Sequence, residues 1–151
     1  KYFGPHIIEA ARSSGQYGKV IFIGSIGSFL GIPYSSAYCA SKGGLVQFAK
    51  VLAVEWAKYR VNVNIVAPGY IKTPLSDSVL SNPETYEKVI SRIPLGEIGR
   101  PEDVANTIVF LVSQASNYLT GAIIPVDAGF LAAAYTAELS ACWNDGGSIY
   151  E

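Results

Sequence analysis

The chain has 151 residues, of which 50% are hydrophobic and 15% are charged, and its formal net charge is -1. This composition is typical of one globular domain and excludes a disordered chain, and the charge balance gives no reason to expect nucleic acid or an anionic membrane as partner. No apolar run approaches the roughly 20 residues needed to cross a bilayer, so no membrane span is expected.

The cysteine and histidine residues exclude further kinds of functional site. The two cysteines, Cys39 and Cys142, have neither metal-ligand nor CxxC spacing and indicate reduced thiols in a cytoplasmic protein. His6 is the only histidine and has no supporting motif, so we expect neither a Ser-His-Asp triad nor a metal site. The sequence begins at Lys1 with no signal-peptide pattern and contains no methionine, and we expect it to be a piece of a longer protein.

Helix and strand patterns alternate along the first half of the chain. Apolar residues at helical spacing over 6–14 predict the end of a helix, and the apolar run 20–23 predicts a strand buried on both faces. After a loop rich in Gly, Ser and Pro, Ser36 is a suitable cap for a long helix that reaches about Tyr59. A second buried strand is predicted over 61–66.

The second half of the chain starts with a long, less regular segment. Within it, Asn82 before a proline predicts a helix start, and Pro101 with its two following acids predicts another. A third strand is predicted over 122–126, whereas the tail 132–151 carries no structural prediction. Strands that alternate with helices predict a parallel sheet, and three such strands alone would leave a bare edge. We therefore expect part of a larger sheet to be absent.

The residues most suited to chemistry are Tyr38 and Lys42, four positions apart on the long predicted helix. This spacing places both side chains on one helix face, where the ammonium favours the phenolate. A tyrosine in that setting can donate a proton to a carbonyl oxygen or accept one from an alcohol. Taken alone, the spacing fits two surface residues that happen to be four positions apart better than it fits a catalytic pair.

Two further groups follow the ends of the first two predicted strands. Ser25 comes directly after the first strand, where its hydroxyl could hydrogen-bond a substrate oxygen. The second strand ends in Pro68-Gly69, and the glycine could let the backbone approach a flat ring while Ile71 and Thr73 hold an amide or phosphate. Each feature alone fits an ordinary turn.

Together and in this order, these motifs resemble the short-chain dehydrogenase/reductase family over about residues 3–131. The resemblance rests on the serine 13 positions before the tyrosine, the YxASK box, the stretch NVNIVAPGYIKTP, the GRPEDVA segment and the YLTG…VDAG ending. It implies an α/β fold, the C-terminal half of a Rossmann-like doubly wound parallel sheet. Residues 1–131 would form part of one NAD(P)-binding domain, and residues 132–151 a tail outside the family pattern.

The resemblance also assigns roles to individual residues. It implies that Tyr38 is the catalytic acid/base, that Lys42 stabilises the phenolate and hydrogen-bonds the nicotinamide ribose, and that Ser25 orients the substrate oxygen. Besides Tyr38 and Lys42, the residues expected to line the nicotinamide side of the cofactor site are Pro68, Gly69, Ile71 and Thr73. Tyr34 is expected to lie near the substrate.

The implied function is reversible hydride transfer between NAD or NADP and a small-molecule alcohol or ketone. Slight differences in pattern favour members similar to gluconate 5-dehydrogenase or to 3-oxoacyl-[acyl-carrier-protein] reductase, so the substrate would be a sugar acid, polyol or 3-oxoacyl compound. The resemblance also implies a homodimer or homotetramer. In agreement, the long predicted helix is apolar on more than one side, and a helix of that kind is buried nearly all round. Its two apolar stripes are Leu45, Phe48, Leu52 and Trp56, and Val46, Ala49, Ala53 and Ala57.

The sequence departs from the family pattern in what it lacks. The glycine-rich TGxxxGxG phosphate loop, the NAG motif and the catalytic asparagine of the family are not among these residues. The alternative is therefore a non-catalytic fragment or an assembly module without the cofactor phosphate loop. A glycine-rich strand–turn–helix about 100 residues upstream of Lys1 would favour the enzyme.

Overall fold

The computed structural model describes residues 2–133, except for the side chains of Ser78 and Val79. The prediction for the tail 132–151 therefore lies, from residue 134 onward, outside the described residues. The chain divides into two compact units, which are described separately. The first contains the residues up to Pro68 and Glu102–Val126, and the second contains Gly69–Pro101 and the residues from Asp127.

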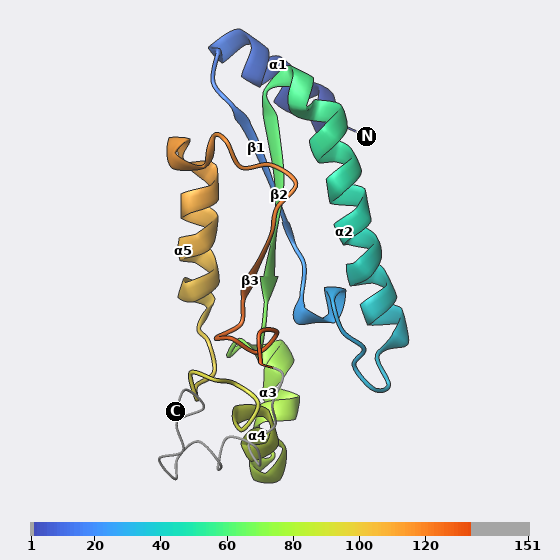
Figure 1. Cartoon of the computed structure of the whole chain (residues 1–151), viewed down its shortest axis with the longest axis vertical. Coiled ribbons are helices and arrows are strands. Elements are labelled where there is room, and N and C mark those ends of the chain that lie inside the picture. The colour runs from blue at the N-terminus through green and yellow to red at the C-terminus, as the bar shows by residue number, and fades with distance from the viewer. Residues whose placement is uncertain (1, 134–151) are drawn as a thin grey trace, which may run out of the picture. The chain divides into compact units, whose positions relative to one another are not determined.

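A parallel sheet forms the centre of the first unit (Figure 1). Its strands are β1 (Gly18–Ile23), β2 (Val61–Pro68) and β3 (Ile123–Val126), in the order β1-β2-β3. Both strand pairs are parallel, as the alternation of strand and helix patterns predicts. All strands therefore end at the same edge of the sheet, which is where ligands bind in open parallel α/β sheets.

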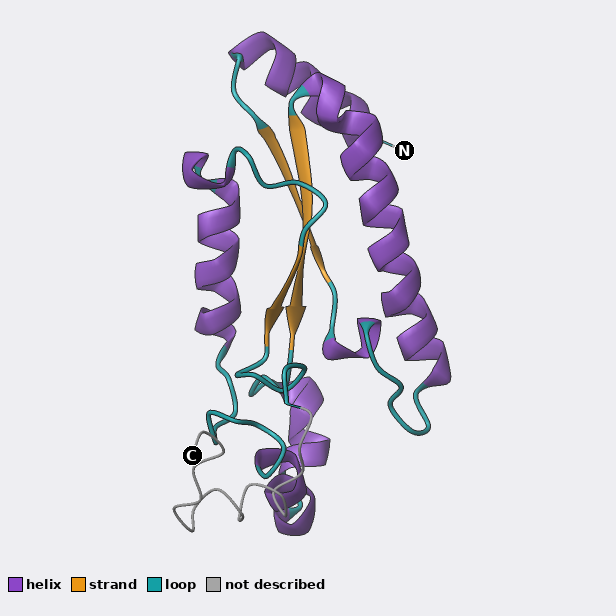
Figure 2. Ribbon diagram, viewed as in Figure 1, coloured by secondary structure: helices purple, strands orange, loops and turns teal. Residues whose placement is uncertain are grey.

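Helices cover the two faces of this sheet (Figure 2). Helices α1 (Phe3–Ser14) and α2 (Ser36–Trp56) lie on one face, and α5 (Pro101–Val112) lies on the other. Ser36 was predicted to cap α2, but it is the first helical residue, and the cap position makes no side-chain hydrogen bond. Among the described residues, no helix is long and apolar enough to cross a membrane.

The hydrophobic core lies between β2 and the helices α1 and α2. Side chains alternate along β2, so Val61, Val63 and Ile65 face the helices, whereas Asn62 and Asn64 face the other way. The small residues on the inner face of α2 let the helix approach the sheet closely. The buried core cluster consists of Ala11, Val46, Ala49, Ala53, Val61, Val63 and Ile65.

The asparagines of β2 order the loop that leads into β3. The Nδ2 group of Asn62 donates to the carbonyl of Asn117 at 3.2 Å, and that of Asn64 donates to the carbonyl of Leu119 at 2.8 Å. The Oδ1 atom of Asn64 accepts from the backbone N–H of Ala122 at 3.1 Å. A strand that the sequence predicts as a plain buried run therefore also carries the polar groups that fix its neighbour.

Strand β1 forms an edge of the described sheet, because it pairs only with β2. All of its residues are partly or largely exposed, and Ile23 at its end is 43% exposed. A strand of this kind presents apolar side chains and unpaired backbone groups to solvent. This agrees with the prediction that a larger sheet is incomplete here.

The second unit contains the short helices α3 (Pro74–Leu80) and α4 (Pro83–Ile90). Asn82 caps α4 as predicted, since its Oδ1 atom accepts from the N–H of Thr85 at 2.9 Å. Helix α3 was not predicted from the sequence; it begins with a capping box between Thr73 and Ser76. An isolated parallel bridge between Ile71 and Gly99 closes the segment that contains both helices.

Candidate active site

Ser25 lies at the carboxyl end of β1, as predicted, and is 7% exposed. It caps the short 3-10 helix η1 (Ile26–Ser28), because its Oγ atom accepts from the N–H of Gly27 at 3.1 Å. The hydroxyl can still donate its own proton, since a serine hydroxyl both accepts and donates. The position of Ser25 is thus set by backbone contacts that leave its donor available.

Ser28 ties η1 to helix α2. Its Oγ atom accepts from the N–H of Ser25 at 3.3 Å and donates to the backbone carbonyl of Lys42 at 3.1 Å. One hydroxyl therefore links the end of β1 to the helix that carries Tyr38 and Lys42. Ser28 could not be recognised from the sequence, because its partner is 14 positions away and on a different element.

The ring of Tyr38 lies against η1 and is still 40% exposed. A side chain at Gly27 would place its Cβ atom 3.2 Å from the Cε1 atom of the ring, so glycine permits this approach. The N–H of the same glycine donates to the hydroxyl of Ser25, so Tyr38 and Ser25 both contact Gly27. Tyr38 is therefore partly open to solvent, as a residue that exchanges a proton with a bound substrate must be.

Lys42 bridges the phenol and the end of β1. Its Nζ atom donates to the carbonyl of Ile23 at 2.9 Å and lies 5.8 Å from the centre of the Tyr38 ring. The bond to Ile23 holds the ammonium beside the ring, on the helix face that the four-residue spacing predicts. Two of its three N–H donors remain for other partners.

The structure therefore brings Ser25, Tyr38 and Lys42 together at the carboxyl edge of the sheet. This group of three is called the Ser-Tyr-Lys cluster below. It offers a hydroxyl donor, a phenol that can transfer a proton, and an ammonium with donors to spare. Such a donor set suits a substrate oxygen and the hydroxyls of a nicotinamide ribose, so these residues fit the nicotinamide end of a dinucleotide.

The predicted cofactor residues after β2 fall at the boundary of the two units. Pro68 ends β2, and Gly69 begins the second unit. A Cβ atom at Gly69 would lie 2.9 Å from the Cα atom of Asp127, so packing within the second unit already requires a glycine there. The hydroxyl of Thr73 lies 3.4 Å from that of Ser76 at the start of α3. Ile71 is held by its bridge to the 97–100 segment.

Tyr34 lies in the loop before α2, where its φ is 62° and its side chain is fully exposed. A bulky residue with positive φ is uncommon, and the loop holds it there without any packing of its ring. Its expected place near the substrate stays a prediction. Among the described residues, no group of His, Cys, Asp and Glu could hold a metal ion.

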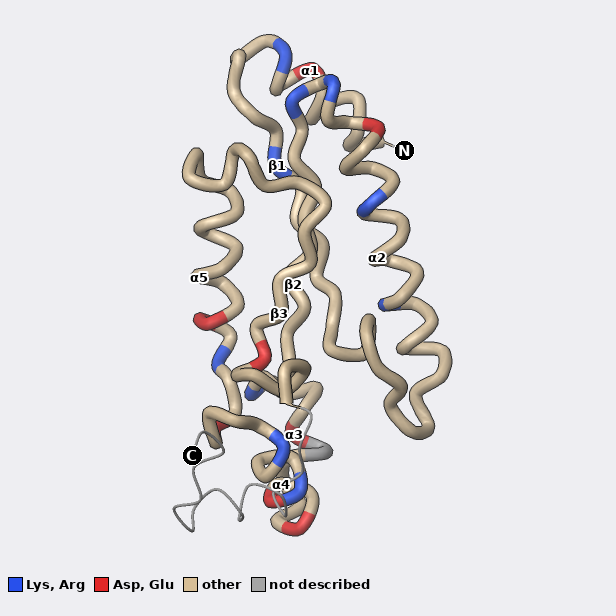
Figure 3. The backbone as a smooth tube through the Cα atoms, viewed as in Figure 1, with Lys and Arg blue, Asp and Glu red and all other residues tan. Residues whose placement is uncertain are grey.

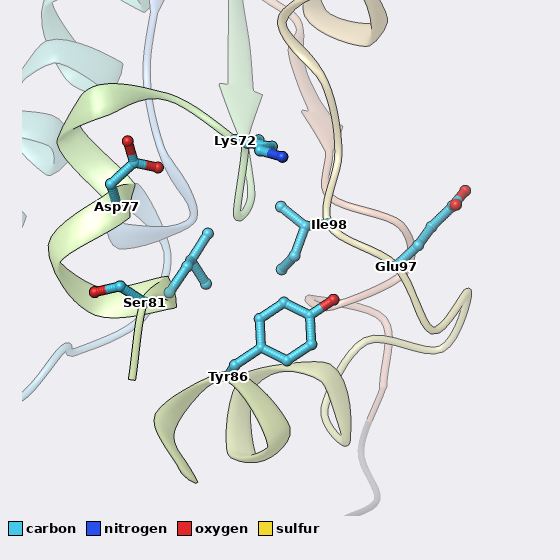
Figure 4. Close-up of a pocket in the computed structure, with 7 residues that line it drawn as sticks. Lys72, Asp77, Ser81, Tyr86, Glu97 and Ile98 are labelled. Atoms are coloured by element: carbon cyan, nitrogen blue, oxygen red, sulfur yellow. The ribbon is translucent and has the colours of Figure 1, made fainter. Parts of the chain in front are cut away.

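The second unit has a cavity of about 610 Å³ of its own (Figure 4). Tyr86 and Ile98 approach each other across it (Figure 4). A volume of this size is within the range of small-molecule sites, about 300–1,000 Å³. The lining residues, none of which the sequence analysis singled out, are Lys72, Asp77, Leu80, Ser81, Tyr86, Glu97 and Ile98.

Comparison with known families decides what kind of protein carries this cluster. The sequence profile described as enoyl-(acyl carrier protein) reductase matches residues 5–131, which is most of the chain. The chain belongs to the short-chain dehydrogenase/reductase family. The family and the fold class predicted from the sequence are thereby confirmed.

Individual members of the short-chain dehydrogenase/reductase family are similar over the same region. A tropinone reductase homolog from Arabidopsis thaliana is 44% identical over 113 residues, covering 75% of this chain and 43% of its own length. A 3-oxoacyl-[acyl-carrier-protein] reductase from Rickettsia felis is 44% identical over 116 residues, covering 77% and 47%. The crystal structure of a gluconate 5-dehydrogenase from Burkholderia cenocepacia, in complex with NADP and tartrate, is 30% identical with a TM-score of 0.80.

The chain is shorter than these short-chain dehydrogenases/reductases. The gluconate 5-dehydrogenase match covers 85% of this chain and 49% of that protein. The chain thus spans about half the length of the relatives it matches, or less.

Proposed function

We propose that the complete protein is an NAD(P)-dependent oxidoreductase that transfers a hydride reversibly between a nicotinamide cofactor and an alcohol or ketone. The observation that carries this proposal is the Ser-Tyr-Lys cluster, in which a partly exposed tyrosine lies beside an ammonium and contacts the same glycine as a buried serine. Membership of the short-chain dehydrogenase/reductase family supports the same chemistry.

In this proposal Tyr38 exchanges the proton and the other two residues of the cluster prepare the reaction. In the reductive direction, the phenol hydroxyl of Tyr38 donates its proton to the substrate carbonyl oxygen. The hydroxyl of Ser25 donates a hydrogen bond to the same oxygen and stabilises the negative charge that develops on it. The ammonium of Lys42 stabilises the phenolate that remains on Tyr38.

The cofactor, when bound, supplies or accepts the hydride. Of its contacts, those proposed for this chain are at the nicotinamide end, where the two unused N–H donors of Lys42 can bind the ribose hydroxyls. By family resemblance, Pro68, Gly69, Ile71 and Thr73 line the nicotinamide side. The gluconate 5-dehydrogenase whose structure is similar was crystallised with NADP, and either NAD or NADP is proposed for this protein.

The substrate classes come from the relatives. They include a gluconate 5-dehydrogenase and a 3-oxoacyl-[acyl-carrier-protein] reductase. For this protein we propose a sugar acid, a polyol or a 3-oxoacyl compound. Hydride transfer by the complete protein should change the absorbance of the reduced nicotinamide when members of these classes are supplied one at a time. Absence of turnover with all of them and with both cofactors, in a folded protein, would favour the alternative of a non-catalytic assembly module.

The proposal includes a homo-oligomer, which the exposed side of α2 supports. Of the second apolar stripe, Val46, Ala49 and Ala53 are buried against the sheet, but Ala57 is exposed. Leu52 and Trp56 pack against the core instead of forming an outer stripe. The apolar side chains left outside are Phe48, Val51 and Val54, the last of them 80% exposed.

Replacing Val54 by Glu in the complete protein should shift it from an oligomer toward monomers. Burying a carboxylate at an apolar interface removes it from water at a large cost in free energy, whereas a carboxylate on a free surface stays hydrated. Light scattering coupled to size-exclusion chromatography measures the change in mass. Ser91→Glu adds the same charge at an exposed position after α4 and should leave the mass unchanged. A wild-type protein that is monomeric at micromolar concentration would refute the oligomer.

A cytoplasmic location belongs to the same proposal. It is supported by Cys39, which is a free thiol in the described part of the chain.

A further inference from the structure

A small polar cavity lies at the amino end of the sheet in the first unit, around the start of β1. Its volume is about 230 Å³, and it is bounded by the turn before β1, the turn before β2 and the region after α5. The residues that line it are Gly15, Gln16, Tyr17, Lys19, Arg60, Val112, Ser113, Gln114 and Asn117. It is called the Lys19–Arg60 cavity below.

Two cations face this cavity from neighbouring strand ends. The Nζ atom of Lys19 donates to the Oγ atom of Ser116 at 2.9 Å, which leaves two of its three donors unused. The guanidinium of Arg60 stacks on the ring of Tyr17, with its Cζ atom 4.7 Å from the ring centre. Stacking holds the plane of the guanidinium in place while its N–H donors remain available at the edge.

The backbone fixes the two cations relative to each other. The N–H of Gly18, next to Lys19, donates to the carbonyl of Arg60 at 3.0 Å, and β1 and β2 pair from this point onward. Arg60 itself has a φ of 60°, the left-handed conformation that ends the turn after α2. The site is therefore built on paired strand ends and not on a loose loop.

Among the residues that the structure describes, no carboxylate neutralises this pair. The nine lining residues include no Asp or Glu, and neither Lys19 nor Arg60 has a carboxylate partner in the described part of the chain. Burial also lowers the pKa of Lys19 below its usual value, which means that the ammonium has lost solvation and would gain from an anion. Figure 3 shows Lys and Arg segments at this end of the unit, together with acidic segments on α1 and α2.

We propose that the Lys19–Arg60 cavity binds a phosphate group, free or as a small monoester. Two unpaired cations match the charge of a phosphate dianion, and the guanidinium edge matches its oxygens bidentately. A volume of 230 Å³ is that of roughly eight waters, which is too small for a dinucleotide and sufficient for one phosphate with its first shell.

A second cavity extends the site for an ester. It has a volume of about 260 Å³ and shares Tyr17, Arg60 and Asn117 with the first. It is also lined by Asn62, whose Oδ1 atom is buried without a hydrogen-bond partner among the described residues. The hydroxyl-bearing organic group of a monoester would fit this second cavity, which is more apolar than the Lys19–Arg60 cavity.

This site is distinct from the Ser-Tyr-Lys cluster. Lys19 and Ser25 are at opposite ends of β1, six positions apart, which corresponds to about 20 Å at roughly 3.3 Å per residue. A phosphate in the Lys19–Arg60 cavity therefore cannot contact the reacting atoms at Tyr38.

Calorimetric titration of the complete protein with inorganic phosphate and with glycerol phosphate tests the proposal. The protein is first saturated with NADP, so that the cofactor's own phosphate contacts are occupied. Saturable binding of one equivalent is expected for both probes, and none for glycerol. Tighter binding of glycerol phosphate than of phosphate would identify a monoester as the ligand, and equal binding would identify the free anion. Absence of saturable binding by either probe would overturn the proposal.

Charge-removing variants locate the binding. Lys19→Gln and Arg60→Gln should each weaken phosphate binding by about tenfold or more, since a hydrogen bond to a charged group is worth about 1.5–3 kcal/mol. Lys58→Gln removes the same charge two positions before Arg60. Because Lys58 lines neither cavity, the affinity of this variant for phosphate should be unchanged. An equal loss in all three variants would show only general attraction and would refute the site. Circular dichroism checks that each variant is folded.

Discussion

Replacing Tyr38 by Phe in the complete protein is expected to reduce the turnover number by about 10²–10⁴-fold, the usual contribution of a general acid–base group. The ring, which packs on Gly27, is retained, so the helix and η1 should keep their arrangement. Only the transferable proton is lost. Cofactor affinity should therefore remain close to that of the wild type, which fluorescence titration with the reduced cofactor measures.

A matched control distinguishes the loss of the Tyr38 proton from the effect of removing a hydroxyl from any tyrosine. Tyr118→Phe makes the same chemical change at a fully exposed tyrosine in the loop before β3 and should leave turnover unchanged. A Tyr38→Phe enzyme with near-normal kcat would refute the catalytic assignment.

Lys42→Ala extends the same experiment, because Lys42 is proposed to act on both the phenol and the cofactor. It should lower turnover and cofactor affinity together, whereas Tyr38→Phe lowers turnover alone. Lys50→Ala, at an exposed position two turns further along α2, provides the control for removing a lysine from this helix. If Lys42→Ala changed only the turnover, the proposed contact with the nicotinamide ribose would be wrong.

The polypeptide of residues 1–151 alone is expected to show no dehydrogenase activity and to bind NAD(H) or NADP(H) at least about 100-fold more weakly than the complete protein. A factor of 100 corresponds to about 2.7 kcal/mol, the scale of one or two charge-assisted hydrogen bonds. In this family the pyrophosphate rests on a glycine-rich turn and a helix N-terminus, and the sequence contains no such turn. The contacts proposed for these residues reach only the nicotinamide end.

The same polypeptide is expected to pack loosely in solution. Strand β1 has a free edge in the described sheet, and Ile23 and its neighbours expose apolar surface. Binding of a hydrophobic dye and loss of near-ultraviolet circular dichroism would report this state. Tight, saturable cofactor binding by residues 1–151, measured by calorimetry beside the complete protein, would contradict the expectation.

The parts of the site that the sequence predicted are those fixed by local geometry. Tyr38 and Lys42 share one helix face because of their four-residue spacing, and Ser25 follows its strand directly. No further knowledge of the fold is needed to bring the first two together. The carboxyl ends of parallel strands then bring the serine to the same edge.

The parts that the sequence did not predict depend on contacts between elements. Ser28 acts through a carbonyl on α2, and Gly27 through its proximity to the ring of Tyr38, so neither stands out among the Ser and Gly residues of its loop. Helix α3 was missed because its capping box has Ser76 where the usual pattern has Glu or Gln. The Lys19–Arg60 cavity joins residues about 40 positions apart, which no spacing rule connects.

The asparagines of β2 have a consequence for how the chain finds its native pairing. Shifting a strand by one residue exchanges its two faces, so a slip of β2 would place Asn62 and Asn64 among the aliphatic side chains below α2. An amide buried there without partners costs roughly 2–7 kcal/mol, and the same slip would leave the carbonyls of Asn117 and Leu119 without their donors. Misaligned sheets are therefore penalised twice, once on each face. We expect Asn64→Val to weaken this discrimination, so that alternative registers compete during refolding even where the native state tolerates the change.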